Sequence, residues 1–293
     1  MKRKASCGRK AFVMANYCLC ILVGIFCLLP ILYVFSLSIS SKDAIISGKV
    51  TIFPIDVTMD NYRYVIKDSQ FYRSFGISVT RTILGLMLQM IMTILTAYPL
   101  SISKNKFPMR SIYAWFFVFT TIFSGGLIPT YLVVSKTGLL NTLWSLLLPY
   151  AVPVFYVILL QNYMKTLPEA LSESASLDGA GHWRIMTQII LPLCKPSLAT
   201  LTLFMAVGHW NEWFDGMLYI NDNRLFPLQT YLRTLIVEVN MNQMADIQSL
   251  ANQIASVGAD TAKIFLAMAP ILMVYPFLQK YFVTGIVQGS VKG

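Results

Sequence analysis

Trp210, Asn211, Glu212 and Trp213 are consecutive residues whose side chains could bind a sugar. The C–H faces of a sugar ring pack well on indole rings, while amide and carboxylate oxygens accept hydrogen bonds from hydroxyl groups. Tryptophan also favours the water–lipid interface, so an aromatic belt at the end of a membrane span explains the same residues. The residues alone leave both interpretations open.

Other kinds of site chemistry find little support. His209 and Glu212 lie three residues apart and could contact a metal, but a metal site needs at least a third ligand. The five cysteines lack C-x-x-C spacing and lie in or beside apolar segments, which indicates packing. Gly48-Lys49 lacks the upstream glycine and the following Ser or Thr of a phosphate-binding loop. We therefore expect neither a metal nor a nucleotide on this chain.

The composition predicts an all-α membrane protein. Hydrophobic residues make up 56% of the chain and charged residues only 12%. Four windows without Asp, Glu, Lys, Arg or His exceed the ~20 residues that cross a bilayer, and they lie between Lys10 and Lys42, Arg81 and Lys104, Arg110 and Lys136, and Lys136 and Lys165. Two further spans, 185–210 and 262–287, carry lysines near their ends that could reach the headgroups. Six membrane-spanning helices are predicted.

Basic residues beside the spans predict the orientation. Five of them in residues 1–11 indicate a cytoplasmic N-terminus, followed by a first span over 12–39 and an extracellular loop over 41–73. That loop also carries five basic residues, a counter-signal that its four aspartates offset. Six crossings return residues 286–293 to the cytoplasm. The net charge of +10 is assigned to topology and contact with anionic lipids, and no basic patch predicts nucleic-acid binding.

Residues 166–196 form a polar, helix-capable stretch between two apolar segments. Thr166 and Glu169 fit a capping box, and a proline suits the first turn that follows. Gly179 can take the left-handed backbone that closes a helix. The spacing predicts one helix over 168–177 and a second helix after the glycine. An ordinary surface hairpin would fit these signals as well.

The spacing in this stretch resembles the EAA loop of binding-protein-dependent ABC importer permeases. Glu173-Ser174-Ala175, three residues, Gly179, nine residues and Ile189-x-Leu191-Pro192 match the family pattern E-A-A-x3-G-x9-I-x-L-P except at Ser174. In such permeases the loop docks into a cleft of a cytoplasmic ATPase subunit. The resemblance implies that residues 166–184 couple this chain to an ATPase.

The same resemblance implies roles for single residues. Glu173 would pair with a basic residue of the ATPase, with a solvated helix face as the alternative. Gly179 and Ala175 would allow close approach, and Asp178 would cap or orient the second helix. Asp178 and Ala180 flank the glycine as in the family, and Leu191 and Pro192 end the motif.

Two further segments extend the resemblance over roughly residues 12–293: Trp210-Asn211-x-Trp213 with Asn223 and Pro227-Leu228-Gln229-Thr230, and the tail from Tyr275-Pro276 to Gly293. Both segments are similar to MalG-like carbohydrate permease subunits of the LplC/YtcP type. The resemblance implies a type I importer (MetI-like) permease fold with its core over 74–285 and a C-terminal tail over 286–293. It also implies a MalF-like second permease, two ABC ATPase subunits that carry ATP and magnesium, and an extracellular solute-binding protein. The complex would import an oligosaccharide through the cytoplasmic membrane of a bacterium.

Polar side chains inside spans, such as Gln89 and Tyr131, could line the path, or could equally satisfy a neighbouring helix. The first four spans contain no acidic residue that a proton-coupled carrier would use. A self-contained carrier or channel, and an ABC permease for a non-sugar solute, stay open as alternatives.

Overall fold

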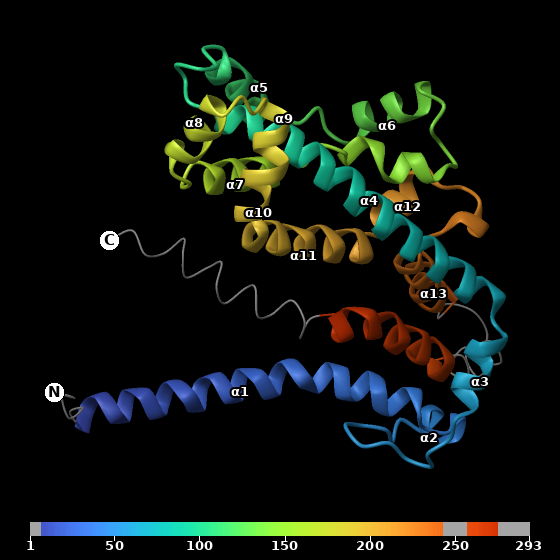
Figure 1. Cartoon of the computed structure of the whole chain (residues 1–293). Coiled ribbons are helices and arrows are strands. Elements are labelled where there is room, and N and C mark those ends of the chain that lie inside the picture. The colour runs from blue at the N-terminus through green and yellow to red at the C-terminus, as the bar shows by residue number, and fades with distance from the viewer. Residues whose placement is uncertain (1–6, 243–256, 275–293) are drawn as a thin grey trace. The chain divides into compact units, whose positions relative to one another are not determined.

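The computed structural model describes residues 7–242 and 257–274, and the regular structure in these residues is helical. The elements are α1 (Cys7–Ser38), α2 (Lys42–Ile46), α3 (Asp60–Lys67), α4 (Ser69–Ser101), α5 (Arg110–Ile122), α6 (Leu127–Lys136), η1 (Leu143–Leu146), η2 (Leu148–Tyr150), α7 (Val154–Met164), α8 (Glu169–Leu177), α9 (His182–Arg184), the π-helix η3 (Ile185–Ile190), α10 (Leu191–Leu193), α11 (Lys195–Asn211), α12 (Phe214–Tyr219), η4 (Asn223–Leu225) and α13 (Leu228–Asn242), and a further helix covers Val257–Val274 (Figure 1). The described parts of residues 1–71 and 232–269 form one compact unit, and those of 72–231 and 270–293 form a second.

Three helices are long and apolar enough to cross a membrane by themselves: Gly8–Ser38, Ser69–Ser101 and Val257–Val274. Three bent pairs of helices also reach this length and composition, which gives up to six spans in the part of the chain that the structure describes. The predicted all-α, polytopic fold is confirmed. Of the predicted sixth span, residues 275–287 lie outside the described residues, as does the predicted tail over 286–293.

Three of the predicted spans are bent pairs of helices in the structure. α5 and α6 are bent by 111°, the helices over 143–164 by 46°, and those over 182–211 by 81°. The sharpest bend follows from Gly126, whose φ of +87° is a backbone conformation that side-chain-bearing residues rarely adopt. Pro153 caps α7 with an extended backbone, so that helix also starts in a new direction.

In the first unit, the loop after α1 folds back on the end of that helix. Leu37, Ala44 and Val50 form its small apolar cluster. The Asn61 side-chain amide donates to the carbonyls of Ser38 and Ser40 at 3.0 and 3.1 Å. The predicted loop over 41–73 is therefore an ordered, hydrogen-bonded structure that includes α2, α3 and the start of α4.

The core of the second unit lies where α4, α7, η3 and α11 meet. Its buried side chains include Ala97, Leu160, Cys194 and Met205. Gln161 is also buried there, and its side-chain amide donates to the carbonyl of Leu100 at 2.8 Å. Burial of these apolar groups stabilises the unit, and the hydrogen bond satisfies a polar group that burial would otherwise penalise.

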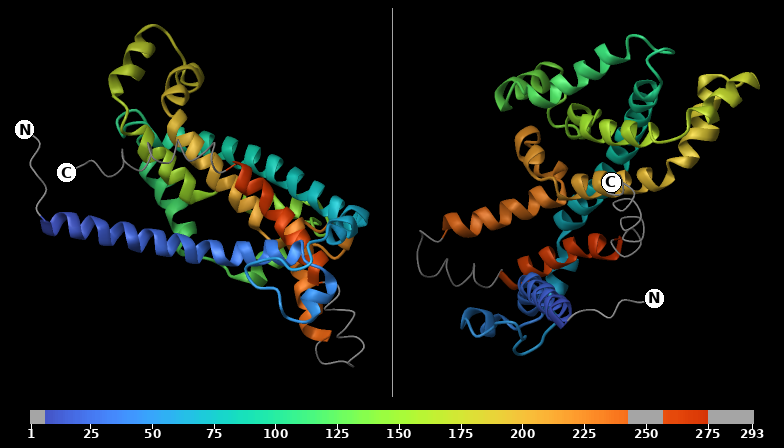
Figure 2. Two further views of the ribbon diagram at one scale, coloured as in Figure 1. Left: turned by 90° about the horizontal axis from the view of Figure 1, so that it is seen from below. Right: turned by 90° about the vertical axis from the view of Figure 1, so that its left-hand side faces the viewer.

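The second unit carries the polar stretch at one end. α5, α7, α8 and α9 gather around the C-terminal end of α4 (Figure 1). Two further views show that α8 and α9, here called the hairpin (residues 169–184), project from this unit beside the start of α11 (Figure 2).

Candidate functional site

The first helix of the hairpin, α8, begins at Glu169, one residue after the predicted start. Thr166 donates its hydroxyl hydrogen to the carbonyl of Tyr163 at 2.7 Å. Pro168 occupies the N-cap position, and no side chain caps the helix there. The predicted capping box between Thr166 and Glu169 is therefore wrong, because the threonine belongs to the turn that ends α7 and its hydroxyl is used in that turn.

The end of α8 confirms the predicted glycine turn. Gly179 has a φ of +79°, and the backbone N–H of Ala180 donates to the carbonyl of Ala175 at 2.9 Å. This left-handed glycine closes the helix and satisfies one of its last carbonyls. The second helix starts at His182, later than expected, and its N-cap is Gly181 without a side-chain bond. Asp178 instead terminates α8, so its expected role as a cap of the second helix is not seen.

Glu173 lies on α8 with its side chain 54% exposed. Its carboxylate forms an ion pair with Lys106 at 3.2 Å. The lysine comes from the link between α4 and α5, 67 residues earlier in the chain. No spacing rule in the sequence relates this lysine to Glu173. This exposed face of the hairpin therefore carries a carboxylate whose intrachain partner is also open to solvent.

The remaining motif residues divide between the surface and the core. Ala175, Ala180 and Leu191 are half-buried and pack against the core of the second unit. Asp178 and Gly179 are exposed. Pro192 lies in the first turn of α10, directly after the π-helix η3. One set of motif residues thus attaches the hairpin to the membrane helices, while the other stays open for contact.

A second polar site occupies a cavity of about 440 Å³ in the second unit. Among the predicted path residues, Gln89 and Glu212 line it. Its wall also contains the rings of Tyr156 and Phe204, which stack with their centroids 6.4 Å apart and their planes 3° apart. The cavity thus combines aromatic faces with hydrogen-bonding groups.

A buried ion pair forms the polar end of this cavity. Arg81 contacts Asp215 at 3.3 Å, and the two side chains are only 2% and 6% exposed. The guanidinium also donates to the carbonyl of Glu212 at 3.1 Å, while the hydroxyl of Tyr150 donates to Asp215 at 3.3 Å. The amide of Gln89 donates to the carbonyl of Tyr150 at 3.0 Å. This network was missed from the sequence, where Arg81 marked only the edge of an apolar window.

The other predicted path residues lie elsewhere. Trp210 is buried and packs edge-on against Phe75, with ring centroids 5.6 Å apart. Asn211 and Trp213 are exposed at the end of α11 and just beyond it. Tyr131 stacks on Tyr219 at 6.4 Å in a separate apolar cluster.

Glu212 has a structural role at this point of the chain. Its carboxylate accepts hydrogen bonds from the backbone N–H groups of Phe214 and Asp215 at 2.7 and 3.2 Å, which caps α12. No third His, Cys, Asp or Glu joins it with His209 to form a metal-binding group within the described residues. Glu212 therefore fixes the turn between α11 and α12 and is not part of a metal site in the described residues.

Comparison with known proteins agrees with this geometry. The family model described as "Binding-protein-dependent transport system inner membrane component" matches residues 74–288. "Protein LplC" of Bacillus subtilis (strain 168) is 41% identical over 273 residues, which cover 92% of this chain and 91% of that protein. The "Polygalacturonan/rhamnogalacturonan transport system permease protein YtcP" of the same organism is 36% identical over 287 residues, covering 97% and 99%.

A solved structure shares the arrangement of the helices. It is described as the crystal structure of a bacterial ABC transporter involved in the import of the acidic polysaccharide alginate. One of its chains is 30% identical to this one with a TM-score of 0.86, and the match covers 96% of this chain and 100% of that chain. The extent of these matches shows that the chain belongs to the family of inner membrane components of binding-protein-dependent transport systems.

Proposed function

We propose that this chain forms half of the translocation pathway of an ATP-driven oligosaccharide importer, and that residues 166–184 couple it to an ATPase subunit. Its relatives LplC and YtcP are carbohydrate ABC transporter permeases, and its family consists of transport subunits, so the chain is a transport subunit and not an enzyme. The observation that carries the coupling assignment is the projecting hairpin, whose motif residues divide into an attached set and an exposed set.

The attached set supports transmission of movement. Ala175 and Ala180 pack against a core that also contains residues of α4, α7 and α11. Close-packed interiors transmit displacement because side chains cannot compress to absorb it. A pull on α8 would therefore move the helices that surround the path, as alternating access requires.

The exposed set supports docking. The ion pair of Glu173 with Lys106 lies on the surface, where such a pair contributes only about 0–1 kcal/mol. A basic residue in a cleft of the ATPase could replace Lys106 at little cost, and would gain from exclusion of water. The exposed Gly179 has open space around it, which leaves room for a partner surface at the end of α8.

The remaining partners follow from the kind of transport system to which this family belongs. A MalF-like second permease would complete the path, and two ATPase subunits would bind ATP and magnesium. An extracellular solute-binding protein would deliver the sugar, as the family description implies. The hairpin and both termini would lie in the cytoplasm, and the described membrane helices would place the chain in a bacterial inner membrane.

The oligosaccharide assignment is supported by the large cavity of the second unit. The stacked Tyr156 and Phe204 offer apolar faces to a sugar ring, and the polar residues Gln89 and Glu212 line the same cavity. The name of the relative YtcP refers to a polygalacturonan/rhamnogalacturonan transport system, which agrees with this class of substrate.

Affinity purification of the full chain from its native membranes tests the assignment. We expect an ABC ATPase to copurify, and a photoreactive group placed at Ser174 on α8 to crosslink to it. The same group placed at Thr137, after α6, serves as the matched control and should give no crosslink. Sugar uptake without any associated ATPase would instead favour a self-contained carrier and overturn the proposal.

A further inference from the structure

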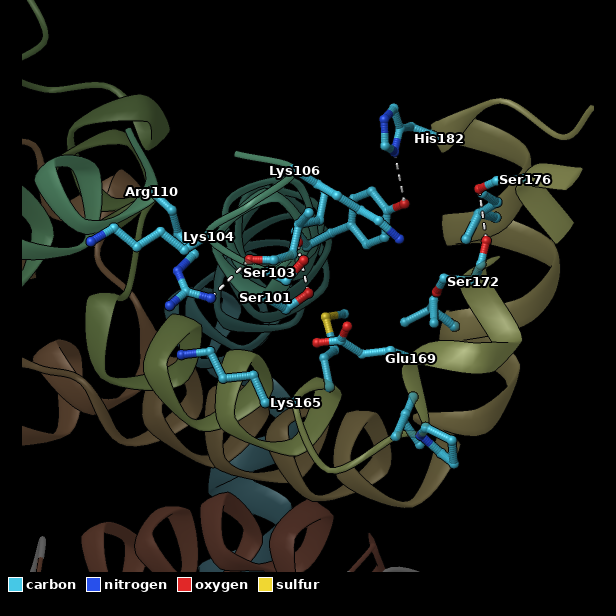
Figure 3. A pocket seen from close by; sticks show the side chains of 17 residues that line it. Ser101, Ser103, Lys104, Lys106, Arg110, Lys165, Glu169, Ser172, Ser176 and His182 are labelled. Carbon is cyan, nitrogen blue, oxygen red and sulfur yellow. Dashed lines mark hydrogen bonds between the residues drawn. The ribbon is translucent and has the colours of Figure 1, made fainter. Parts of the chain in front are cut away.

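A cavity of about 360 Å³ lies between the hairpin and the ends of the neighbouring helices. Its lining comes from the C-terminal end of α4, the link that follows it, the start of α5, the end of α7, and α8 and α9. The link and helix ends place Lys104, Arg110 and Lys165 on one side, while Glu169 and Ser172 of α8 stand on the other (Figure 3).

The charges of this cavity are not balanced. Four of its lining residues are cationic, Lys106 among them, and Glu169 is the single carboxylate in the lining. Lys106 is paired with Glu173. Among the described residues, no ion pair neutralises Lys104, Arg110 or Lys165. The cavity therefore keeps an excess of positive charge that its own carboxylate does not neutralise.

Two of these cations lie close to each other. Burial, and then the neighbouring charge of Arg110, lower the pKa of the Lys165 ammonium group. Arg110 is held in place, since its guanidinium donates to the carbonyl of Ile102 at 2.8 Å. The remaining N–H groups of the guanidinium are left to bind a ligand. An anion between Arg110 and Lys165 would relieve their repulsion and accept hydrogen bonds from both.

We propose that this cavity binds a phosphate group, carried either by the headgroup of an anionic phospholipid or by free phosphate. Several oxygens around one phosphorus can meet the planar guanidinium of Arg110 and the ammonium group of Lys165 at once, which a single carboxylate cannot do as well. The volume of the cavity accommodates a headgroup as well as a free ion. The cavity lies at the ends of α4 and α7, where the apolar spans stop. Lipid headgroups lie at this depth of a membrane.

The test uses the full chain purified together with its partner subunits and stripped of lipid. Binding of phosphatidylglycerol is counted by native mass spectrometry, with phosphatidylcholine as the comparison lipid. Binding of [³²P]orthophosphate is measured by equilibrium dialysis. The test variants are Lys165→Gln and Lys104→Gln, chosen because neither side chain makes an ion pair within the described residues. Lys195→Gln, outside the cavity, is the matched control.

We expect saturable binding of phosphatidylglycerol or orthophosphate to the unaltered chain and to Lys195→Gln. Lys165→Gln should weaken it about tenfold, the loss of one charge-assisted hydrogen bond, and Lys104→Gln should weaken it less, since it removes only a nearby positive charge. Phosphatidylglycerol alone would identify the lipid as the source, orthophosphate alone would identify the soluble ion, and displacement of one by the other would show a shared site. Absence of saturable binding, or equal effects of all three substitutions, would overturn the proposal. Binding to the isolated chain that disappears in the complex would also overturn it, since a partner would then cover the cavity.

Discussion

Glu173 has two possible ionic partners, one in its own chain and one expected on an ATPase. Its pair with Lys106 is half-exposed at both ends, with side-chain exposures of 54% and 48%. An exposed pair of this kind contributes about 0–1 kcal/mol to stability, so neither residue is needed for folding. Substitutions of Glu173 and of Lys106 can therefore be compared for their effects on transport, because neither should change the stability of the protein.

If Glu173 docks on the ATPase as proposed, replacing it by Gln should reduce sugar uptake while ATP hydrolysis by the complex continues, because the carboxylate loses its charge. Replacing Lys106 by Gln should leave uptake within about twofold of the unaltered protein, since the intrachain pair contributes so little. Uptake and ATPase activity in proteoliposomes measure both effects. Equal losses in the two variants would assign the function to the intrachain pair and contradict a docking role for Glu173.

Gly179 provides a second comparison at the scale of single residues. Its φ of +79° is unfavourable for any residue with a Cβ, at a cost of about 1–2 kcal/mol. Gly181 lies two residues away with an ordinary φ of −74°, and both glycines have open space around them. Gly179→Val should therefore distort the turn and lower coupled uptake, whereas Gly181→Ala should have little effect.

Amide hydrogen exchange of α8 measures this distortion directly. Faster exchange in Gly179→Val with unchanged membrane insertion would place the effect in the hairpin. Equal exchange in both variants would show that the turn does not depend on the left-handed backbone.

For single residues, only features that depend on neighbouring positions in the chain could be predicted from the sequence. The turn at Gly179 follows from one residue type and its neighbours, and it is present. The capping box at Thr166 is also a local pattern, but α7 ends at the same place and takes the hydroxyl. The pairs Lys106–Glu173 and Arg81–Asp215 join residues 67 and 134 positions apart, and the spacing of one sequence contains no signal for such contacts.

At the scale of elements, hydropathy predicts how much apolar chain is present but not its direction. The window between Arg110 and Lys136 is long enough for one span, yet it contains two helices bent by 111°. The bend depends on the φ of Gly126, which a count of apolar residues does not reveal. The helix α4 likewise begins at Ser69, well before Arg81, so this arginine lies within a long helix and not at its edge.

The ion pair between Arg81 and Asp215 joins α4 to α12 within the second unit. Because both side chains are almost fully buried, removing one charge leaves the other without compensation, at a cost of about 3–5 kcal/mol. Asp215→Asn should therefore lower the thermal stability of the purified protein strongly. The double variant Arg81→Met with Asp215→Leu should recover much of the loss.

An exposed ion pair supplies the control for this prediction. Asp60 and Arg63 contact each other at 3.1 Å with side chains 62% and 75% exposed. Asp60→Asn should change the melting temperature little. If Asp215→Asn were equally harmless, the buried pair would not stabilise the link between α4 and α12.

At the scale of the whole molecule, the functional assignment depends on which side of the membrane the hairpin faces. Ser174 lies exposed on α8, and Ser47 lies exposed in the loop after α1. One predicted span precedes Ser47 and four precede Ser174, so with a cytoplasmic N-terminus Ser47 should face the outside and Ser174 the cytoplasm. In a variant without the native cysteines, Ser174→Cys should react with a membrane-impermeant maleimide only in inside-out vesicles, and Ser47→Cys only in right-side-out vesicles.

Bound ATPase should protect Ser174→Cys and not Ser47→Cys, because only the hairpin is expected to enter its cleft. Labelling of Ser174→Cys from the outside would remove the hairpin from any cytoplasmic partner and contradict the coupling function as a whole.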